Sequence, residues 1–278
     1  SIWSMTAAGR DATRLTMRAN RGPDTAPAIS PRGDQAAFSS PREGVAKIHL
    51  VALNGVGART LTDGAGGGDT DPSWSPDGKK LVFVRGRPDE RRDLYVVDLE
   101  SGAAPTLLLE GQDDDPSIAG WPVWSPDGKT LAFSSDRGEG RGIGLWLVAS
   151  DGTGLRRLTH PPMALRWVRD LRPAWSPDGQ RIAFASNRHA GAEKDAEDLD
   201  VYAVELANGA LQRLTRDPGI AADPCYSPDG ARLFFVSTRE AVRPYATEIF
   251  VMPAAGGEQH RITKDAIPEN SAPSAGRR

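Results

Sequence analysis

Three aspartates recur at one place in a repeated pattern, three residues before a proline, and they are the first residues that could carry chemistry. The series comprises Asp24, Asp69 and Asp170, with Asn270 at the equivalent place and Ala119 and Ala221 interrupting it. If the fold gathers their oxygen atoms at one opening, these atoms could bind a hard divalent cation or an amine. The same carboxylates can instead accept hydrogen bonds from backbone N–H groups of a turn, which needs no ligand. We favour this second interpretation and keep a metal site as the alternative.

The segment 160–172, with the sequence HPPMALRWVRDLR, combines arginines with a tryptophan. Arg and Trp are the side chains that most often dominate binding energy at interfaces. A helical turn in this segment would place Arg166 and Arg169 on one face. In the alternative interpretation, Trp167 packs beneath the loop and the arginines pair with nearby acids. The predicted binding residues are Arg166, Trp167, Arg169, Asp170, Arg172, His160 and, from an equivalent segment, Trp121.

Metal ligation by histidine or cysteine has little support in the sequence. His160, His189 and Asp170 could together ligate zinc, but their spacing fits no compact metal-binding motif. Cys225 is the single cysteine, which excludes an internal disulfide and cysteine-based metal sites. The acidic run 113–115 is better explained as an exposed loop than as a cation site. We therefore expect no cofactor. The alternative is a divalent cation held by the repeated aspartates, at the mouth of the axial channel that the repeat described next would form.

A repeat positions all of these residues. The tetrapeptide Ser-Pro-Asp-Gly begins at Ser75, Ser125, Ser176 and Ser227, and Ser-Pro-Arg-Gly begins at Ser30, which gives spacings of 45, 50, 51 and 51 residues. Each copy follows a Pro-x-Trp-like segment and precedes an alternating apolar run, a strand ending in a glycine hairpin, and an Arg-Leu-Thr-like strand. Four short strands repeated at about 40 to 50 residues predict propeller blades.

The repeats span residues 24–62, 69–108, 119–159, 170–215 and 221–263, and residues 1–16 and 270–278 supply pieces of a further unit. We expect these two ends to close the ring, so that residues 1–278 form a single propeller domain. No copy of the second strand is present for the closing unit, which is either three-stranded or incomplete. Trp74, Trp124 and Trp175 recur in register and are predicted to lie in the core between blades.

The repeated motifs resemble a known family. The series Pro-x-Trp-Ser-Pro-Asp-Gly, an apolar strand ending in Phe-x-Ser, Leu-Tyr-Val-Val-Asp and Arg-Leu-Thr is similar to TolB-type propellers with WD40-like (PD40) repeats. The resemblance covers essentially the whole chain and implies an all-β, six-bladed propeller of four-stranded antiparallel blades. Bacterial TolB also has an α/β domain, to which nothing here corresponds. Similar propellers gate the S9 peptidases, but the Gly-x-Ser-x-Gly nucleophile motif of their hydrolase domain is absent from this sequence.

Composition excludes several classes of function. Thirty-four Lys and Arg residues against 37 Asp and Glu give a net charge of -3, so the chain lacks the basic excess typical of nucleic-acid binding. The sequence contains no run of 18 apolar residues, which is the length that a membrane-spanning helix needs. The first ten residues, SIWSMTAAGR, do not read as a signal peptide, and we expect a processed or trimmed chain.

The sequence thus favours a non-catalytic binding propeller that recognises a peptide, a protein or a cell-envelope ligand at the channel mouth. We expect a monomer, and the resemblance implies a bacterial protein that is periplasmic or secreted. Two alternatives stay open. One is a metal-assisted lyase or hydrolase built on the propeller. The other is the gating propeller of a larger S9-type peptidase.

Overall fold

The computed structural model describes residues 1–17, 22–111, 120–138, 142–160, 168–189, 198–239 and 247–263. These residues form strands and no helix, so none of them builds a helix that could cross a membrane. The strands are β1 (Trp3–Ser4), β2 (Thr13–Arg14), β3 (Thr25–Ile29), β4 (Gln35–Ser40), β5 (Lys47–Ala52), β6 (Arg59–Thr60), β7 (Asp69–Trp74), β8 (Lys80–Gly86), β9 (Arg92–Asp98), β10 (Thr106–Leu109), β11 (Gly120–Trp124), β12 (Thr130–Ser135), β13 (Gly142–Ala149), β14 (Arg156–Arg157), β15 (Val168–Trp175), β16 (Arg181–Ser186), β17 (Asp200–Glu205), β18 (Leu211–Arg213), β19 (Ala221–Tyr226), β20 (Arg232–Ser237), β21 (Glu248–Pro253) and β22 (His260–Arg261).

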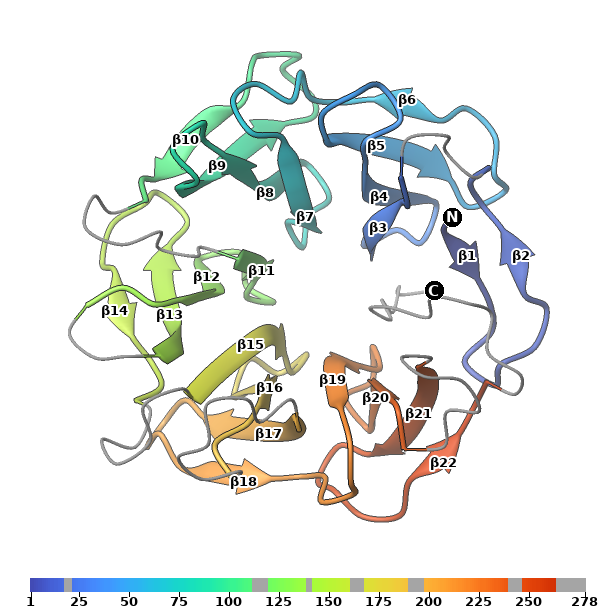
Figure 1. Ribbon diagram of the computed structural model, residues 1–278, viewed down its shortest axis with the longest axis vertical. Helices are drawn as coiled ribbons and strands as arrows, with labels where there is room; N and C mark the ends of the chain where they lie inside the picture. Colours follow the sequence, from blue (N-terminus) through green and yellow to red (C-terminus); the bar gives the residue numbers. More distant parts are fainter. Residues whose placement is uncertain are drawn as a thin grey trace.

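The strands follow one another around a ring as antiparallel units (Figure 1). In each four-stranded unit the first strand lies nearest the ring axis and the fourth lies outermost, which gives β3, β7, β11, β15 and β19 the axial positions. A short parallel pairing, Gly142 with Val168 and Ile143 with Arg169, joins β13 to β15 of the next unit. The chain is therefore an all-β propeller, as the repeat predicts.

Each Ser-Pro-Asp-Gly segment forms the turn between the first and second strands. In the β7–β10 unit, Ser75 donates its hydroxyl hydrogen to Asp77 at 2.6 Å, and Asp77 accepts the backbone N–H of Lys79 at 3.0 Å. The turn ends at Gly78, whose φ of 73° is the left-handed conformation that glycine adopts without a steric penalty. The same bonds recur in the next three units, so the turn fixes the register of the two strands it joins.

The second strand of each unit forms the core. Its phenylalanine is fully buried in every four-stranded unit: Phe38, Phe83, Phe133, Phe184 and Phe235. The hydrophobic clusters around these rings combine residues of two neighbouring units, as where Ala132 and Leu145 pack with Ile182 and Phe184. Sheets with two apolar faces must be covered on both sides, and stacking around a ring achieves this.

Tryptophans of the first strands lie at the seams between units. Trp74 Nε1 donates to the Ala28 carbonyl of the preceding unit at 3.0 Å, and Trp175 Nε1 donates to the Val123 carbonyl at 3.3 Å. Trp124 holds the equivalent place, but its buried N–H has no hydrogen-bond partner among the residues that the structure describes. A cavity of about 250 Å³ lies at this seam, lined by Trp124 and by both adjoining Ser-Pro-Asp-Gly turns. The seam between the β7–β10 and β11–β14 units therefore packs differently from the two on either side.

The first unit differs from the rest. Its described strands, β1 and β2, form a two-stranded sheet. The tail segment 270–278, expected to contribute to this unit, lies outside the described residues. The count of six blades and the closure by both ends consequently stay predictions.

Candidate functional site

A β-bulge occupies the same place in every axial strand of the four-stranded units. The register between first and second strands shifts between Thr25 and Ala28, Thr70 and Ser73, Gly120 and Val123, Leu171 and Ala174, and Ala222 and Cys225. Each bulge consists of one residue followed by the repeated proline, which has no N–H to donate to the neighbouring strand. Bulges of this kind redirect side chains and are frequent next to functional sites.

The residue before each of these prolines is left-handed although none is glycine. Its φ lies between 49° and 56° at Ala26, Asp71, Trp121, Arg172 and Asp223. We call these residues the axial ring. A left-handed L-residue costs about 1–2 kcal/mol, and such strain concentrates where a structure positions functional side chains.

Side chains of the axial ring contact one another across units. Arg172 forms an ion pair with Asp223 of the following unit. Its guanidinium carbon also lies 5.1 Å from the ring centre of Trp121 in the preceding unit, a cation–π distance. Arg172 thus joins three consecutive units at the axis.

Asp71 is the electrostatically unusual member of the axial ring. Burial raises the pKa of its carboxyl group, Arg172 opposes the rise, and Asp223 adds to it. Arg92 also opposes the rise, and Asp71 and Asp223 hold the same place in the axial strands β7 and β19. The one side-chain hydrogen bond described for Asp71 comes from Thr70 at 3.3 Å. A partly buried carboxylate with so few donors retains capacity to bind a cationic or N–H group.

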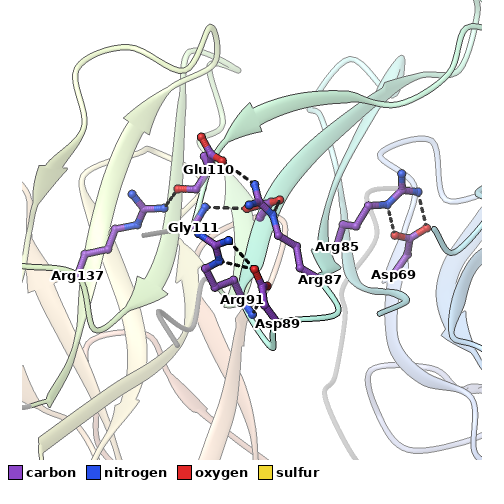
Figure 2. A network of polar contacts seen from close by, with 9 residues as sticks. Asp69, Arg85, Arg87, Asp89, Arg91, Glu110, Gly111 and Arg137 are labelled. Carbon is purple, nitrogen blue, oxygen red and sulfur yellow. Dashed lines mark hydrogen bonds and ion pairs between the residues drawn. The ribbon is translucent and has the colours of Figure 1, made fainter. Parts of the chain in front are cut away.

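The aspartates selected from the sequence lie two residues earlier and belong to arginine pairs. Arg42 donates to Asp24 at 2.8 Å, and Arg85 donates to Asp69 at 2.7 and 2.9 Å (Figure 2). Arg188 donates to Asp170 at 2.5 Å. Two of the carboxylates also accept hydroxyl hydrogens, Asp24 from Thr16 and Asp170 from Thr159 and Ser186.

These partners differ from the backbone capping that we expected. Only Asp69 accepts a backbone N–H among the described bonds, from Gly64 at 3.2 Å, and both Asp69 and Asp170 lie within strands rather than in entering turns. Burial opposes ionisation of Asp24, but bonds from Thr16, Ser40 and Arg42 keep its pKa below the usual value. No group of three metal-ligating side chains is present in the described ranges. The metal site stays a prediction, and these three carboxylates do not converge on one point.

An arginine network joins loops of two neighbouring units (Figure 2). Arg87 donates to Asp93 at 2.6 Å and to Glu110 at 2.9 Å. Arg137, from the next unit, reaches the backbone carbonyl of Glu110, and no carboxylate of the described residues pairs with it. Burial lowers the pKa of Arg137. The network links the β7–β10 and β11–β14 units through the loops that follow their second and fourth strands. The cavity at the same seam is lined instead by the Ser-Pro-Asp-Gly turns that follow their first strands.

The predicted binding residues do not share one location. Arg172 and Trp121 meet in the axial ring, whereas Asp170 is fully buried in its pair with Arg188. Arg169 is exposed on β15, and its backbone N–H bonds to Asn187 at 2.8 Å. Arg169 lies in β15 rather than in a helical turn, because a parallel pairing with β13 extends the strand to Val168.

The other candidates complete this comparison. His160 is exposed, while Arg166, Trp167 and the acidic run 113–115 lie outside the described residues. His189 contacts Asp200 at 3.3 Å rather than Asp170, and burial lowers the pKa of its imidazole. Sequence reasoning missed Asp71 and Asp223. A signal for these two residues was available in the sequence. The residue immediately before each repeated proline changes its type from unit to unit, while the residues around it stay constant.

Comparisons with known proteins agree with this architecture. The sequence matches the family described as the TolB beta propeller domain over residues 10–118 and 169–276. It is 28% identical over 222 residues to the uncharacterized peptidase YuxL of Bacillus subtilis (strain 168), covering 66% of this chain and 32% of that protein. It is 31% identical over 219 residues to the uncharacterized protein Atu1656 of Agrobacterium fabrum (strain C58 / ATCC 33970), covering 75% of this chain and 68% of the relative.

Among solved structures, TolB from Acinetobacter baumannii superposes with a TM-score of 0.69 at 22% identity, covering 89% of this chain and 55% of that one. At this identity the likeness concerns the fold. The chain thus spans about a third of the peptidase and about half of the TolB structure that it matches.

Proposed function

This chain belongs to the TolB beta propeller family, and from that premise we propose that it is a non-catalytic binding module whose axial ring receives an extended segment of a protein partner. The observation that carries the proposal is Asp71. Its carboxylate is partly buried, has a raised pKa and accepts one described side-chain bond, and the charges of Arg172, Arg92 and Asp223 act on it, while Arg172 in turn contacts Asp223 and Trp121. Binding sites combine a few converging polar groups with perturbed ionisation in this manner.

The ring suggests the chemistry of the ligand. Arg172 is already balanced by Asp223 and covers Trp121, whereas Asp71 has no ion-pair partner among the described residues. The ligand group that best complements Asp71 is therefore a Lys or Arg side chain, or an amino terminus. Once such a group is bound, its positive charge offsets the cost of keeping the carboxylate ionised away from water.

The test uses an immobilised array of random dodecapeptides, followed by fluorescence anisotropy with labelled copies of the best binders. Wild-type protein is expected to select peptides containing Lys or Arg, and replacing that residue by norleucine or citrulline should weaken binding at least tenfold. Asp71→Asn should weaken binding similarly. The matched control is Asp151→Asn, which removes an equal charge from an exposed hairpin turn.

Two results would contradict the proposal. If no peptide binds in the micromolar range, the peptide-binding role fails. If peptides bind and neither Asp71→Asn nor Arg172→Met alters their affinity, the binding site lies elsewhere and the role of the axial ring fails.

The match to a peptidase favours a second candidate, in which a propeller of this kind filters the substrates of an attached hydrolase. Both candidate functions place the ligand at the axis. They differ in whether a hydrolase domain is part of the same polypeptide. An exported location, periplasmic or secreted, also belongs to the proposal, because it follows from the family resemblance. Fractionation of the source cells with an antibody to the chain tests it.

A further inference from the structure

The cavity at the seam between the β7–β10 and β11–β14 units has the size of a small-molecule site. Its volume of about 250 Å³ lies just below the ~300–1,000 Å³ of sites for drug-sized ligands, so it suits a ligand of about one ring. Apolar surface comes from rings of both units, namely Pro76, Pro126 and Trp124. Trp124 belongs to a core cluster, whereas Trp74 and Trp175 only pack against theirs. Trp124 is therefore more deeply buried than the tryptophans at the two neighbouring seams.

The indole N–H of Trp124 lacks the acceptor that its counterparts have. At both neighbouring seams the indole N–H donates to a backbone carbonyl of the preceding unit. The carbonyl at the equivalent place here belongs to Ser73, and Trp124 donates neither to it nor to any other acceptor in the described part of the chain. A buried donor without an acceptor destabilises the folded state, so an oxygen atom supplied by a ligand is favourable at this point.

Two carboxylates on the cavity wall each keep one oxygen available. Oδ1 of Asp77 accepts the hydroxyl hydrogen of Ser75 at 2.6 Å and the backbone N–H of Lys79 at 3.0 Å, and Oδ1 of Asp127 accepts the same two bonds in its own turn. Oδ2 of neither side chain accepts a bond from the residues that the structure describes. The serine hydroxyl is the main cause that keeps the pKa of each carboxyl group below its usual value, so both groups are ionised at neutral pH.

The cavity wall carries charges of both signs. Besides the two aspartates, Lys80 supplies an ammonium group and Ser150 an exposed hydroxyl group. A cationic ligand meets the charge of Lys80, and an anionic ligand meets those of the carboxylates, so either kind encounters a like charge. A neutral ligand with several hydroxyl groups avoids this cost, because each hydroxyl can donate to a carboxylate oxygen and accept from an N–H group.

We propose that this cavity binds one neutral sugar ring or cyclic polyol, with hydroxyl groups donating to Asp77 and Asp127 and a hydroxyl oxygen accepting from the indole N–H of Trp124. A pyranose fits both kinds of wall, because its C–H groups form apolar faces that pack on proline and tryptophan rings, while its hydroxyl groups lie around the edge. The turns that line the cavity follow the first strands, whereas the axial ring lies in the bulges within them. The sugar site is therefore independent of the proposed peptide-binding function.

The test is nuclear magnetic resonance of the isotope-labelled whole protein, with D-glucose, D-galactose, D-mannose and myo-inositol as probes. The indole N–H signal of Trp124 is identified as the one that Trp124→Phe lacks. At least one neutral probe is expected to shift this signal in a saturable manner in the millimolar range. Glucosamine and glucuronate, the cationic and anionic counterparts of glucose, should bind about tenfold more weakly than the best neutral probe.

Two substitutions locate the site, and saturation transfer to the signals of the sugar measures the affinity of each variant. Asp127→Asn keeps the Oδ1 acceptor of the turn and replaces only the available Oδ2, and it should weaken binding about tenfold. The matched control is Asp178→Asn, because Asp178 makes the same two bonds in the next unit and does not line the cavity. Trp124→Phe should weaken binding similarly, and Trp175→Phe should leave it unchanged. Circular dichroism verifies that each variant is folded.

Three results overturn the proposal. The first is that no neutral probe shifts the Trp124 signal saturably. The second is that a charged counterpart binds more tightly than every neutral probe, which would show that the wall selects for charge. The third is that Asp127→Asn and Asp178→Asn have equal effects, which would place the sugar elsewhere. Because Asp127→Asn leaves the axial ring intact and Asp71→Asn leaves the cavity intact, failure of this site and failure of the proposed function are distinguished.

Discussion

Asp69 and Asp71 are two residues apart on the same strand and have different environments. The carboxylate of Asp69 is enclosed by Arg85 and by a backbone N–H. Asp71 lies in the bulge itself, and burial raises the pKa of its carboxyl group. The bulge separates them, because it changes which side of the strand the next residue faces. Residue type alone therefore did not distinguish a structural aspartate from a candidate ligand-binding one.

Asp71→Asn should stabilise the folded protein at neutral and higher pH. Since the folded-state pKa is raised above the unfolded value, the folded state holds the proton more tightly, and stability falls as pH rises between these two values. Each unit of elevation corresponds to about 1.4 kcal/mol. Thermal unfolding across a pH series should show the variant's advantage shrinking toward acid pH, where Asp71 is protonated. An advantage that is independent of pH would show that charge is not its cause.

Asp170→Asn should destabilise the protein strongly. Asp170 is fully buried and Arg188 is nearly so, and removing one member of such a pair leaves a buried charge, at a cost of about 3–5 kcal/mol. Urea unfolding measures the change. Glu100→Gln is the control, because its pair with Lys79 is exposed on both sides and should contribute about 1 kcal/mol or less. Equal effects of the two substitutions would contradict this reading of the aspartate series.

At the scale of elements, the second and third strands followed from alternation and turn chemistry. The alternating apolar run that follows the Ser-Pro-Asp-Gly segment at Ser125 forms β12, Thr130–Ser135. The first strand was less predictable. The Pro-x-Trp-like segment marks only the second half of this strand, because β7 begins at Asp69 and continues through the bulge. A period of two cannot be counted across an inserted residue, so the sequence located the strand without showing which residues reach the axis.

The seams between units permit a matched comparison of tryptophans. Trp175→Phe removes the bond to the Val123 carbonyl and should cost about 1 kcal/mol more than Trp124→Phe, whose buried indole N–H has no partner in the described part of the chain. Trp74→Phe should behave like Trp175→Phe. Urea unfolding of the three variants gives the ranking. If Trp124→Phe is the most damaging of the three, an unidentified acceptor satisfies its N–H.

At the scale of the whole molecule, each unit depends on its neighbours for stability, because hydrophobic clusters combine residues from both sides of a seam. One such cluster joins Val82 and Leu94 with Trp124 and Phe133, and another joins Ala183 and Val201 with Leu233 and Phe235. The ring arrangement and its repeat were predictable from spacing. The contacts that converge at the axis were not, because they join residues about 50 positions apart whose meeting depends on curvature, as Arg172 and Asp223 do.

Phe184→Ala should therefore affect the entire ring. Truncating a buried phenylalanine costs about 3–5 kcal/mol, and here the cavity opens in a cluster shared by two units. Tryptophan fluorescence and far-ultraviolet circular dichroism should report the same lowered midpoint in a single transition. Separate transitions by the two probes would show that units unfold one by one, as in open repeat arrays.

The five bulges have a consequence for engineering. At each, the backbone conformation is set by the proline and its strand, and residues as unlike as Ala26, Trp121 and Asp223 occupy it. The ring therefore provides five interchangeable positions of equal geometry around one axis. Randomising them together would produce a library of receptors on a constant scaffold, in which new specificities can be selected without redesigning the fold.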